Sequence, residues 1–278
     1  SPPCFQHPHK TAHTFLIFGR GIATVQRLVV QENRLAVGSK KCVHRAVMFG
    51  ALAQGQTQVR AWLPAGDTEA SLASVMKLGI KVERHNQHEM TIHGGEFQKP
   101  DSPLNLVNAG TGIRLIAGIM CGQPFASILD GSEQLRRRPM KRIVAPLQQM
   151  GANITATNDR APLTIVPAQM HGIRYDMPVA SAQVKSAILL AGLYAEGETI
   201  VTQPGPARDH TERMLSAMGA DIHTDGRLVA IRPKWPLQPM NLTVPGDISS
   251  AAFVIVAGLL VPGSDLTLTG INLNPTRT

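Results

Sequence analysis

The chain has 278 residues, a net charge of +8 and 43% hydrophobic residues, enough for a substantial core in one large domain or two ordinary ones. The longest apolar run is broken by glycine and proline before it could span a bilayer of about 30 Å. Aromatic residues, on which nucleic-acid bases stack, make up only 4% of the chain, so the positive charge points to a small anionic ligand and away from a membrane or nucleic acid.

The first 23 residues match no recognisable pattern. They lack the basic segment and long apolar core of a secretory signal. The three cysteines have neither metal-ligand nor paired spacing, which fits a reducing compartment. We therefore expect a cytoplasmic protein.

A repeated pattern organises the rest of the chain. Three segments, at 37–59, 179–201 and 244–268, run from a polar turn through an apolar helix to a glycine and then a β-branched strand, and residues 106–128 give a fourth copy. A second kind of helix ends at a glycine three times, where a left-handed residue is favoured: Gly79, Gly151 and Gly219. Their spacing of about seventy residues predicts one repeated unit of strand, helix, strand, helix, strand, strand.

The start of each first helix carries groups that suit an anion. At 38–45, Ser39 is predicted to cap a helix whose first turns contain Lys40, Lys41 and Arg45. Cations oppose the dipole at a helix N-terminus, so they need either a bound phosphate or carboxylate, or exposure to solvent.

The next helix start, at 108–114, has the sequence NAGTGIR. Gly110 and Gly112 allow the backbone N–H groups to approach a ligand, and Thr111 adds a hydroxyl. The same residues are also typical of a glycine-containing N-cap that binds no ligand. Shortly after it, residues 136–142 hold five positive charges in the sequence RRRPMKR. Such a density requires counter-charge from water, carboxylates or a ligand.

Two later helix starts are mostly neutral. Ser181 and Gln183 offer hydrogen bonds suited to hydroxyl groups, although such residues are often caps. Asp209 with Glu212 three residues on predicts a capping box, with Arg208 just outside it. That structural task makes both carboxylates poor candidates for acid/base chemistry.

These motifs together resemble the 5-enolpyruvylshikimate-3-phosphate (EPSP) synthase family, in particular its glyphosate-tolerant bacterial class. The resemblance covers roughly residues 35–278, and its six motifs are NAGTGIR, LRRRPM, ASAQVKSAILLAGL, ARDHTERML, VPGDISSAAF and the terminal NPTRT. It implies an α/β protein with the two-domain inverse α/β barrel of the enolpyruvyl transferases, built from repeated βαβαββ units with helices inside three faces of sheet.

The resemblance also divides the chain. Residues 35–241 would form a first domain of three units, and 242–278 the beginning of a second domain that is largely missing, because the chain stops within its fourth unit. Residues 1–34 would be an N-terminal segment, and an opening strand of the second domain, at 27–35, would begin within it.

The implied reaction transfers the enolpyruvyl group of phosphoenolpyruvate to the 5-hydroxyl of shikimate 3-phosphate and releases phosphate. These two substrates are the implied partners of a monomer that binds neither nucleic acid nor membrane, and no metal or organic cofactor takes part. Position by position, Lys40 and Arg138 match the family's catalytic cations. The phosphoenolpyruvate and glyphosate site maps to Lys40, Asn108, Gly110, Thr111 and Arg138, and the shikimate 3-phosphate site to Lys40, Lys41, Arg45, Ser181, Gln183 and Arg208.

Three differences from the family pattern stand out. Lys41 occupies the position of a phosphate-binding serine, in a turn where Val37 replaces a proline, and Ala182 replaces a serine of the commoner class. The acid/base carboxylates belong to the family's second half, so the chain by itself is expected to be inactive. We also retain a UDP-N-acetylglucosamine enolpyruvyl transferase, although residues 131–139 lack that family's loop cysteine, and a noncatalytic protein that binds a phosphate ligand or nucleic acid.

Overall fold

The computed structural model describes residues 39–272 and residue 274, and its body consists of three similar units. The expected strand at 27–35, the turn residue Val37 and most of the terminal NPTRT motif lie outside the described residues. The first unit contains α1 (Lys40–Leu52), β1 (Gly55–Arg60), α2 (Gly66–Lys77), β2 (Lys81–Asn86) and β3 (Glu89–Gly94). The second contains β4 (Leu104–Asn105), α3 (Gly110–Met120), β5 (Ser127–Asp130), α4 (Glu133–Arg136), α5 (Lys141–Gln149), β6 (Asn153–Thr157) and β7 (Arg160–Val166). The third contains β8 (Arg174–Asp176), α6 (Ala182–Gly192), β9 (Thr199–Thr202), α7 (His210–Ala217), β10 (Asp221–Asp225) and β11 (Leu228–Arg232), and the chain continues through β12 (Leu242–Thr243) and α8 (Ile248–Leu260).

Each unit forms a four-stranded sheet with one strand order. The sheets run β12-β1-β3-β2, β4-β5-β7-β6 and β8-β9-β11-β10, and in each the first pair is parallel while the other pairs are antiparallel. In the second and third units the parallel pair is joined through a helix, α3 or α6, as a parallel crossover requires. The predicted order of strands and helices is confirmed for these two units.

The first sheet takes its outer strand from a distant part of the chain. Val59 and Arg60 of β1 pair with Leu242 and Thr243 of β12, which follows the third unit. The predicted domain boundary after residue 241 places these two residues at the start of the next domain. Their backbone nevertheless pairs with the first sheet.

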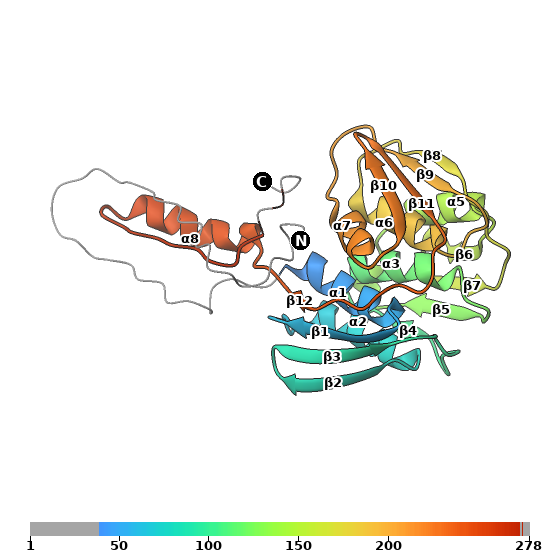
Figure 1. Cartoon of the computed structure of the whole chain (residues 1–278), viewed down its shortest axis with the longest axis horizontal. Helices are drawn as coiled ribbons and strands as arrows, with labels where there is room; N and C mark the ends of the chain where they lie inside the picture. Colours follow the sequence, from blue (N-terminus) through green and yellow to red (C-terminus); the bar gives the residue numbers. More distant parts are fainter. Residues whose placement is uncertain (1–38, 273, 275–278) are drawn as a thin grey trace.

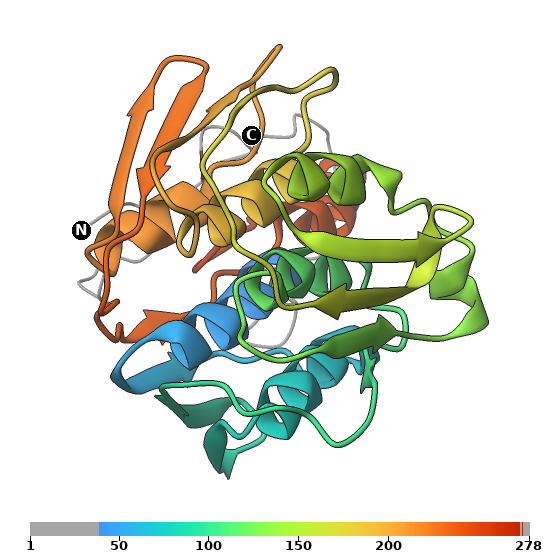
Figure 2. The same cartoon turned by 90° about the vertical axis from the view of Figure 1, so that its right-hand side faces the viewer.

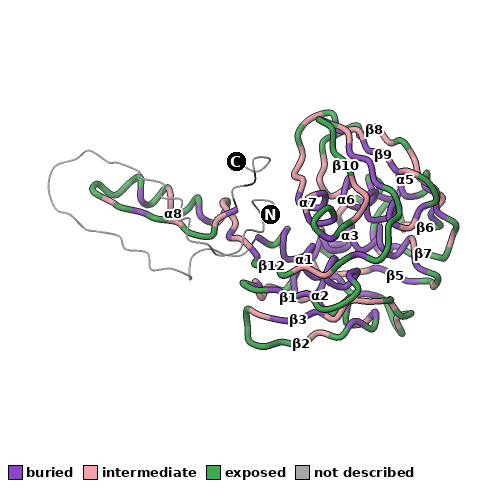
Figure 3. The backbone as a smooth tube through the Cα atoms, in the orientation of Figure 1, coloured by how far each residue is buried: buried purple, intermediate pink, exposed green. Residues whose placement is uncertain are grey.

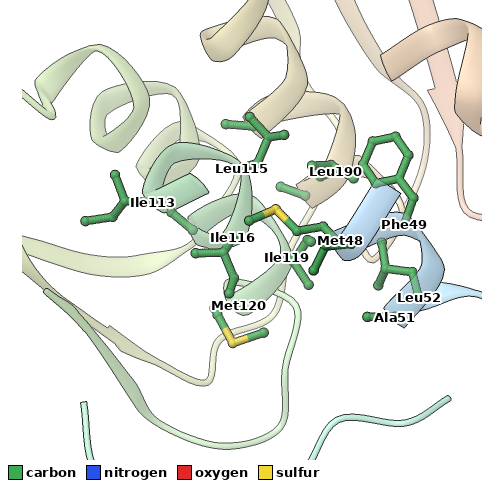
Figure 4. Close-up of a cluster of buried hydrophobic side chains, with 14 of the residues drawn as sticks. Met48, Phe49, Ala51, Leu52, Ile113, Leu115, Ile116, Ile119, Met120 and Leu190 are labelled. Carbon is green, nitrogen blue, oxygen red and sulfur yellow. The ribbon is translucent and has the colours of Figure 1, made fainter. Parts of the chain in front are cut away.

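Helices α1, α3 and α6 occupy the space between the three sheets (Figures 1 and 2). Nearly all of their residues are buried (Figure 3), and Met48, Ile116, Ile119 and Leu190 lie together at their interface (Figure 4). A helix surrounded by sheets must be apolar on all sides, and α3 and α6 are almost free of charged residues. This is the expected arrangement of helices inside faces of sheet.

The helix stops that the glycines predict are confirmed. Gly79, Gly151 and Gly219 have φ angles of +89°, +89° and +81°. After each of them, the next residue donates its N–H five residues back into the helix, from Ile80 to Val75 in the first unit.

Helix α8 projects away from the three-sheet body (Figure 1). Only Ala251 and Gly258 are buried on it, whereas Phe253 and Leu260 are 81% and 76% exposed. Within the described part of the chain, no helix combines the length and the apolar character needed to cross a bilayer.

Candidate ligand-binding site

A cavity of about 230 Å³ lies where the N-terminal ends of α1, α3, α6 and α7 meet. Four helix N-termini contribute partial positive charge and unsatisfied N–H groups to one space, which favours an anion there. The described residues that line the cavity are Lys41, Arg45, Thr111, Ala180, Ser181, Ala182, Gln183, Arg208 and His210.

The charged side chains of this lining are all positive. Lys41, Arg45 and Arg208 contribute cations, and the described lining contains neither aspartate nor glutamate. The electrostatic field inside the cavity therefore attracts a negatively charged ligand. A carboxylate that acts as an acid or base would have to come from outside the described lining.

Arg45 is the deepest of these cations, with 2% of its surface exposed. Its guanidinium donates to Thr211 Oγ1 at 2.7 Å, to Ser186 Oγ at 2.9 Å and to the Lys41 carbonyl at 2.9 Å. Burial lowers its pKa, because the charged form loses hydration. Since these three acceptors are neutral, a bound anion would supply the counter-charge that a buried cation requires.

The start of α6 forms the opposite wall. Ser181 caps the helix by accepting from the N–H of Val184 at 3.4 Å. Gln183 donates from Nε2 to Thr111 Oγ1 at 2.9 Å, which ties α6 to the first turn of α3. Ser181 and Gln183 thus have structural partners, and both also face the cavity.

A second cationic region lies on the other side of the first turn of α3. Arg138 packs directly on Gly110, because a Cβ atom added to that glycine would lie 2.3 Å from Arg138 Nη1. Arg114 donates to the Gly110 carbonyl at 2.7 Å, and Asn108 accepts from Ser132 nearby. Burial lowers the pKa of Arg114, and the charges of Arg138 and Arg142 lower it further.

The basic stretch at 136–142 divides by its partners. Arg136 pairs with Asp130, Arg137 with Glu133, and Lys141 with Asp159. Among the described residues, neither Arg138 nor Arg142 has such a carboxylate partner. Of these two, Arg138 packs on Gly110 next to Thr111 of the cavity lining, so it is the better placed to meet an external anion.

The structure separates two of the predicted site residues that are neighbours in sequence. Lys41 faces the cavity, but Lys40 is half exposed and its Nζ lies 3.2 Å from Asp67 Oδ1 at the start of α2. Of the predicted shikimate 3-phosphate set, the structure brings together Lys41, Arg45, Ser181, Gln183 and Arg208, joined by Thr111. Gly110 and Arg138 lie next to Thr111, whereas Lys40 is not among the residues that line the cavity.

The predicted helix caps are corrected in two places. Ser39 occupies the N-cap position of α1 but makes no side-chain cap, and Asp209 makes none at α7. Asp209 instead accepts from Arg213 Nε at 2.7 Å. Glu212 does not complete a capping box, because it forms an ion pair with Lys185 in which both side chains are buried. The sequence contains the capping-box pattern, but in the structure the Glu212 carboxylate pairs with the buried Lys185 of α6.

His210 is a lining residue that the sequence patterns did not identify. The capping pattern of the ARDHTERML motif involves Asp209 and Glu212 and assigns no role to the histidine between them. It is 1% exposed, and burial together with the charge of Arg45 lowers its pKa to about 4. The imidazole is therefore neutral at pH 7.

Comparisons with known proteins show the family to which this chain belongs. The family model described as EPSP synthase (3-phosphoshikimate 1-carboxyvinyltransferase) matches residues 30–278. A 3-phosphoshikimate 1-carboxyvinyltransferase from Acidithiobacillus ferrooxidans is 49% identical over 244 residues, which cover 87% of this chain and 56% of that protein. One from Shouchella clausii is 48% identical over 245 residues, covering 86% of this chain and 57% of the relative.

A solved structure gives the same result in three dimensions. An EPSP synthase from Acinetobacter baumannii superposes with a TM-score of 0.83 at 45% sequence identity, covering 88% of this chain and 56% of that one. The chain thus spans a little over half the length of the relatives it matches. None of these relatives is a UDP-N-acetylglucosamine enolpyruvyl transferase by name, so the comparisons do not favour that alternative.

Proposed function

Because this chain belongs to the EPSP synthase family, we propose that its cavity binds shikimate 3-phosphate for the transfer of an enolpyruvyl group from phosphoenolpyruvate. In this reaction the 5-hydroxyl of shikimate 3-phosphate attacks phosphoenolpyruvate while the methylene carbon of the donor takes up a proton. Phosphate then leaves from the tetrahedral intermediate. Fixed cations stabilise the charges of both substrates in such a step.

One observation carries the proposal. Five of the six residues assigned to shikimate 3-phosphate come from three helix starts, the first of which lies more than 130 residues before the other two in sequence, yet they line one cavity. Three of the five are cations, which suit a phosphate and a carboxylate, and Ser181 and Gln183 suit hydroxyl groups.

Phosphoenolpyruvate would lie beside the first substrate, across the first turn of α3. Gly110 and Arg138 adjoin Thr111, which lines the cavity and accepts from Gln183. In this arrangement Arg138 binds a carboxylate or phosphate of the donor. Lys40 would serve the donor by exchanging its exposed contact with Asp67 for the ligand.

A substitution of Lys41 tests whether the cavity binds shikimate 3-phosphate. Replacing the ammonium with a hydroxyl in Lys41→Ser removes one charge-assisted contact, so shikimate 3-phosphate should bind about tenfold more weakly to this chain by calorimetry. Lys81→Ser, on the exposed strand β2, is the control and should leave the affinity unchanged.

Two outcomes would contradict the proposal. Equal affinity in the wild type and Lys41→Ser would contradict a charge-assisted contact between the Lys41 ammonium and the ligand. Binding of a short nucleic-acid duplex in place of shikimate 3-phosphate, with a steep dependence on salt, would favour the nucleic-acid alternative.

A further inference from the structure

Asn274 joins the end of the described chain to the first turn of α7. Its amide nitrogen Nδ2 lies 2.5 Å from Asp209 Oδ1 and 3.0 Å from His210 Nδ1. Burial raises the pKa of Asp209, but hydrogen bonds from Asn274 and Arg213 outweigh this effect and hold it below its usual value. Asp209 is therefore ionised at neutral pH and only accepts hydrogen bonds.

This carboxylate fixes the orientation of the Asn274 amide. The NH₂ group must face Asp209, because an amide oxygen there would meet the carboxylate oxygen. The same NH₂ group then directs its second hydrogen to His210 Nδ1. Since Nδ1 accepts, the proton of the neutral imidazole resides on Nε2.

The segment that carries Asn274 is held in place by backbone and side-chain contacts. Gly246 and Ile271 form a parallel bridge, and the N–H of Asn272 donates to the Gly246 carbonyl at 2.9 Å. The side chain of Asn272 accepts from the N–H of Asn274 at 3.0 Å. Both asparagines are buried, so Asn274 holds a defined position against α7.

We propose that His210 is a ligand-binding residue that donates Nε2–H to an oxygen of shikimate 3-phosphate, and that Asn274 is the positioning residue that sets this tautomer. His210 lines the cavity, whereas Asn274 is not in its lining and contacts the Nδ1 edge of the ring. A neutral donor complements the three cations, because it adds a directional hydrogen bond without more buried charge. The ligand half of this inference rests on the proposed function, whereas the role of Asn274 does not.

Nitrogen-15 spectroscopy of the histidine rings tests the relay without any substrate. In the labelled 278-residue chain at pH 7.5, His210 should show an unprotonated Nδ1 and a protonated Nε2, with its signals identified by their loss in His210→Gln. Asn274→Leu should convert His210 to a mixture of tautomers, whereas Asn153→Leu, on an exposed position of β6, should not. A Nδ1–H tautomer or an imidazolium in the wild type would overturn the relay.

Titration with shikimate 3-phosphate tests the ligand contact. The Nε2 signal of His210 should shift, while that of His44, a buried histidine paired with Ser71 away from the cavity, should not. His210→Asn keeps an acceptor for Asn274 but is too short to place a donor at the position of Nε2, so it should weaken binding about tenfold. His210→Gln places a donor near that position and should weaken binding less than about threefold.

The outcomes separate the two proposals. Binding that leaves His210 Nε2 unshifted, or that is equally weak in the Asn and Gln variants, would refute the role of His210 alone. If shikimate 3-phosphate shifts no histidine and no heat of binding is found, the proposed function fails and the contact of His210 with this ligand fails with it. The tautomer measurement would still decide the role of Asn274.

Discussion

At the scale of single residues, neighbours in sequence have very different surroundings. Arg136 and Arg138 lie two positions apart in one basic stretch, but Arg136 is paired with Asp130 while Arg138 packs on Gly110 at the start of α3. A cation already neutralised by a carboxylate has little to gain from a ligand. Arg138 has no described carboxylate partner, so it can still gain a charge-assisted contact from a ligand.

We therefore predict that Arg138→Ala weakens phosphoenolpyruvate binding much more than Arg136→Ala does. Loss of a charge-assisted contact at Arg138 should cost about 1.5 to 3 kcal/mol, or roughly 10- to 100-fold in affinity. Arg136→Ala should change the affinity by less than about twofold. Calorimetry on a chimera of this chain with the remaining part of a relative measures both, and equal losses would refute the assignment.

Gly110 offers a second test at this scale. In Gly110→Ala the new methyl group would lie 2.3 Å from Arg138 Nη1. The fold should persist, because the clash is with the end of a flexible side chain, but displacement of Arg138 should lower phosphoenolpyruvate affinity about tenfold. Gly66→Ala, where the added Cβ meets nothing within 4 Å, is the control. Unchanged affinity in Gly110→Ala would show that Arg138 does not act from this position.

At the scale of elements, α1 carries polar groups into the core together with its apolar residues. His44 is 2% exposed and its Nδ1 lies 2.8 Å from Ser71 Oγ on α2. Burial is the main cause that lowers its pKa, to about 4 from 6.5. Protonation of this ring therefore opposes the packing of α1 on α2.

The sign of the resulting pH dependence follows from that pKa. The unfolded chain takes up the proton as the pH falls through about 6.5, but the folded chain does so only near 4, so stability is full above 6.5 and falls between these values. At pH 5 this one group should cost about 2 kcal/mol. Urea unfolding at pH 7.5 and pH 5 measures the difference, which His44→Gln should reduce and the exposed control His223→Gln should not. An equal pH effect in His44→Gln would contradict the assignment.

For the molecule as a whole, the cavity that we propose to bind shikimate 3-phosphate has no aspartate or glutamate in its described lining. The chain spans 56% of its Acidithiobacillus relative. Helix α8 projects from the body, and its apolar residues Phe253 and Leu260 are exposed. Enolpyruvyl transfer requires positioned acid and base groups as well as cations. The division into domains at residue 241 remains a prediction.

We predict that the 278-residue chain binds shikimate 3-phosphate but does not release phosphate from the two substrates. Activity should appear when the remaining part of a relative is added, because closure of two halves would bring acid/base groups to the bound ligands. Phosphate release is measured with the chain alone, with the added part alone and with both. Turnover by the chain alone at a rate typical of enzymes would refute this prediction.

Features that depend on short stretches of chain can be predicted from the amino-acid sequence alone. The repeated units, the glycine stops at Gly79, Gly151 and Gly219, and the cap at Ser181 follow from periodicity and local backbone preferences. The family resemblance rests likewise on contiguous motifs, and the family model confirms it.

Which of these stretches meet in space depends on the packing of the whole fold. Residues of one helix turn point in different directions, so Lys41 enters the cavity while Lys40 contacts Asp67. Glu212 pairs with Lys185 because the packing of α6 against α7 buries both charges, and the local capping pattern contains no information about that partner. The pairing of β12 with β1 and the contact of Asn274 with His210 likewise join segments far apart in the chain. Such contacts arise from the packing of whole elements, which no local pattern specifies.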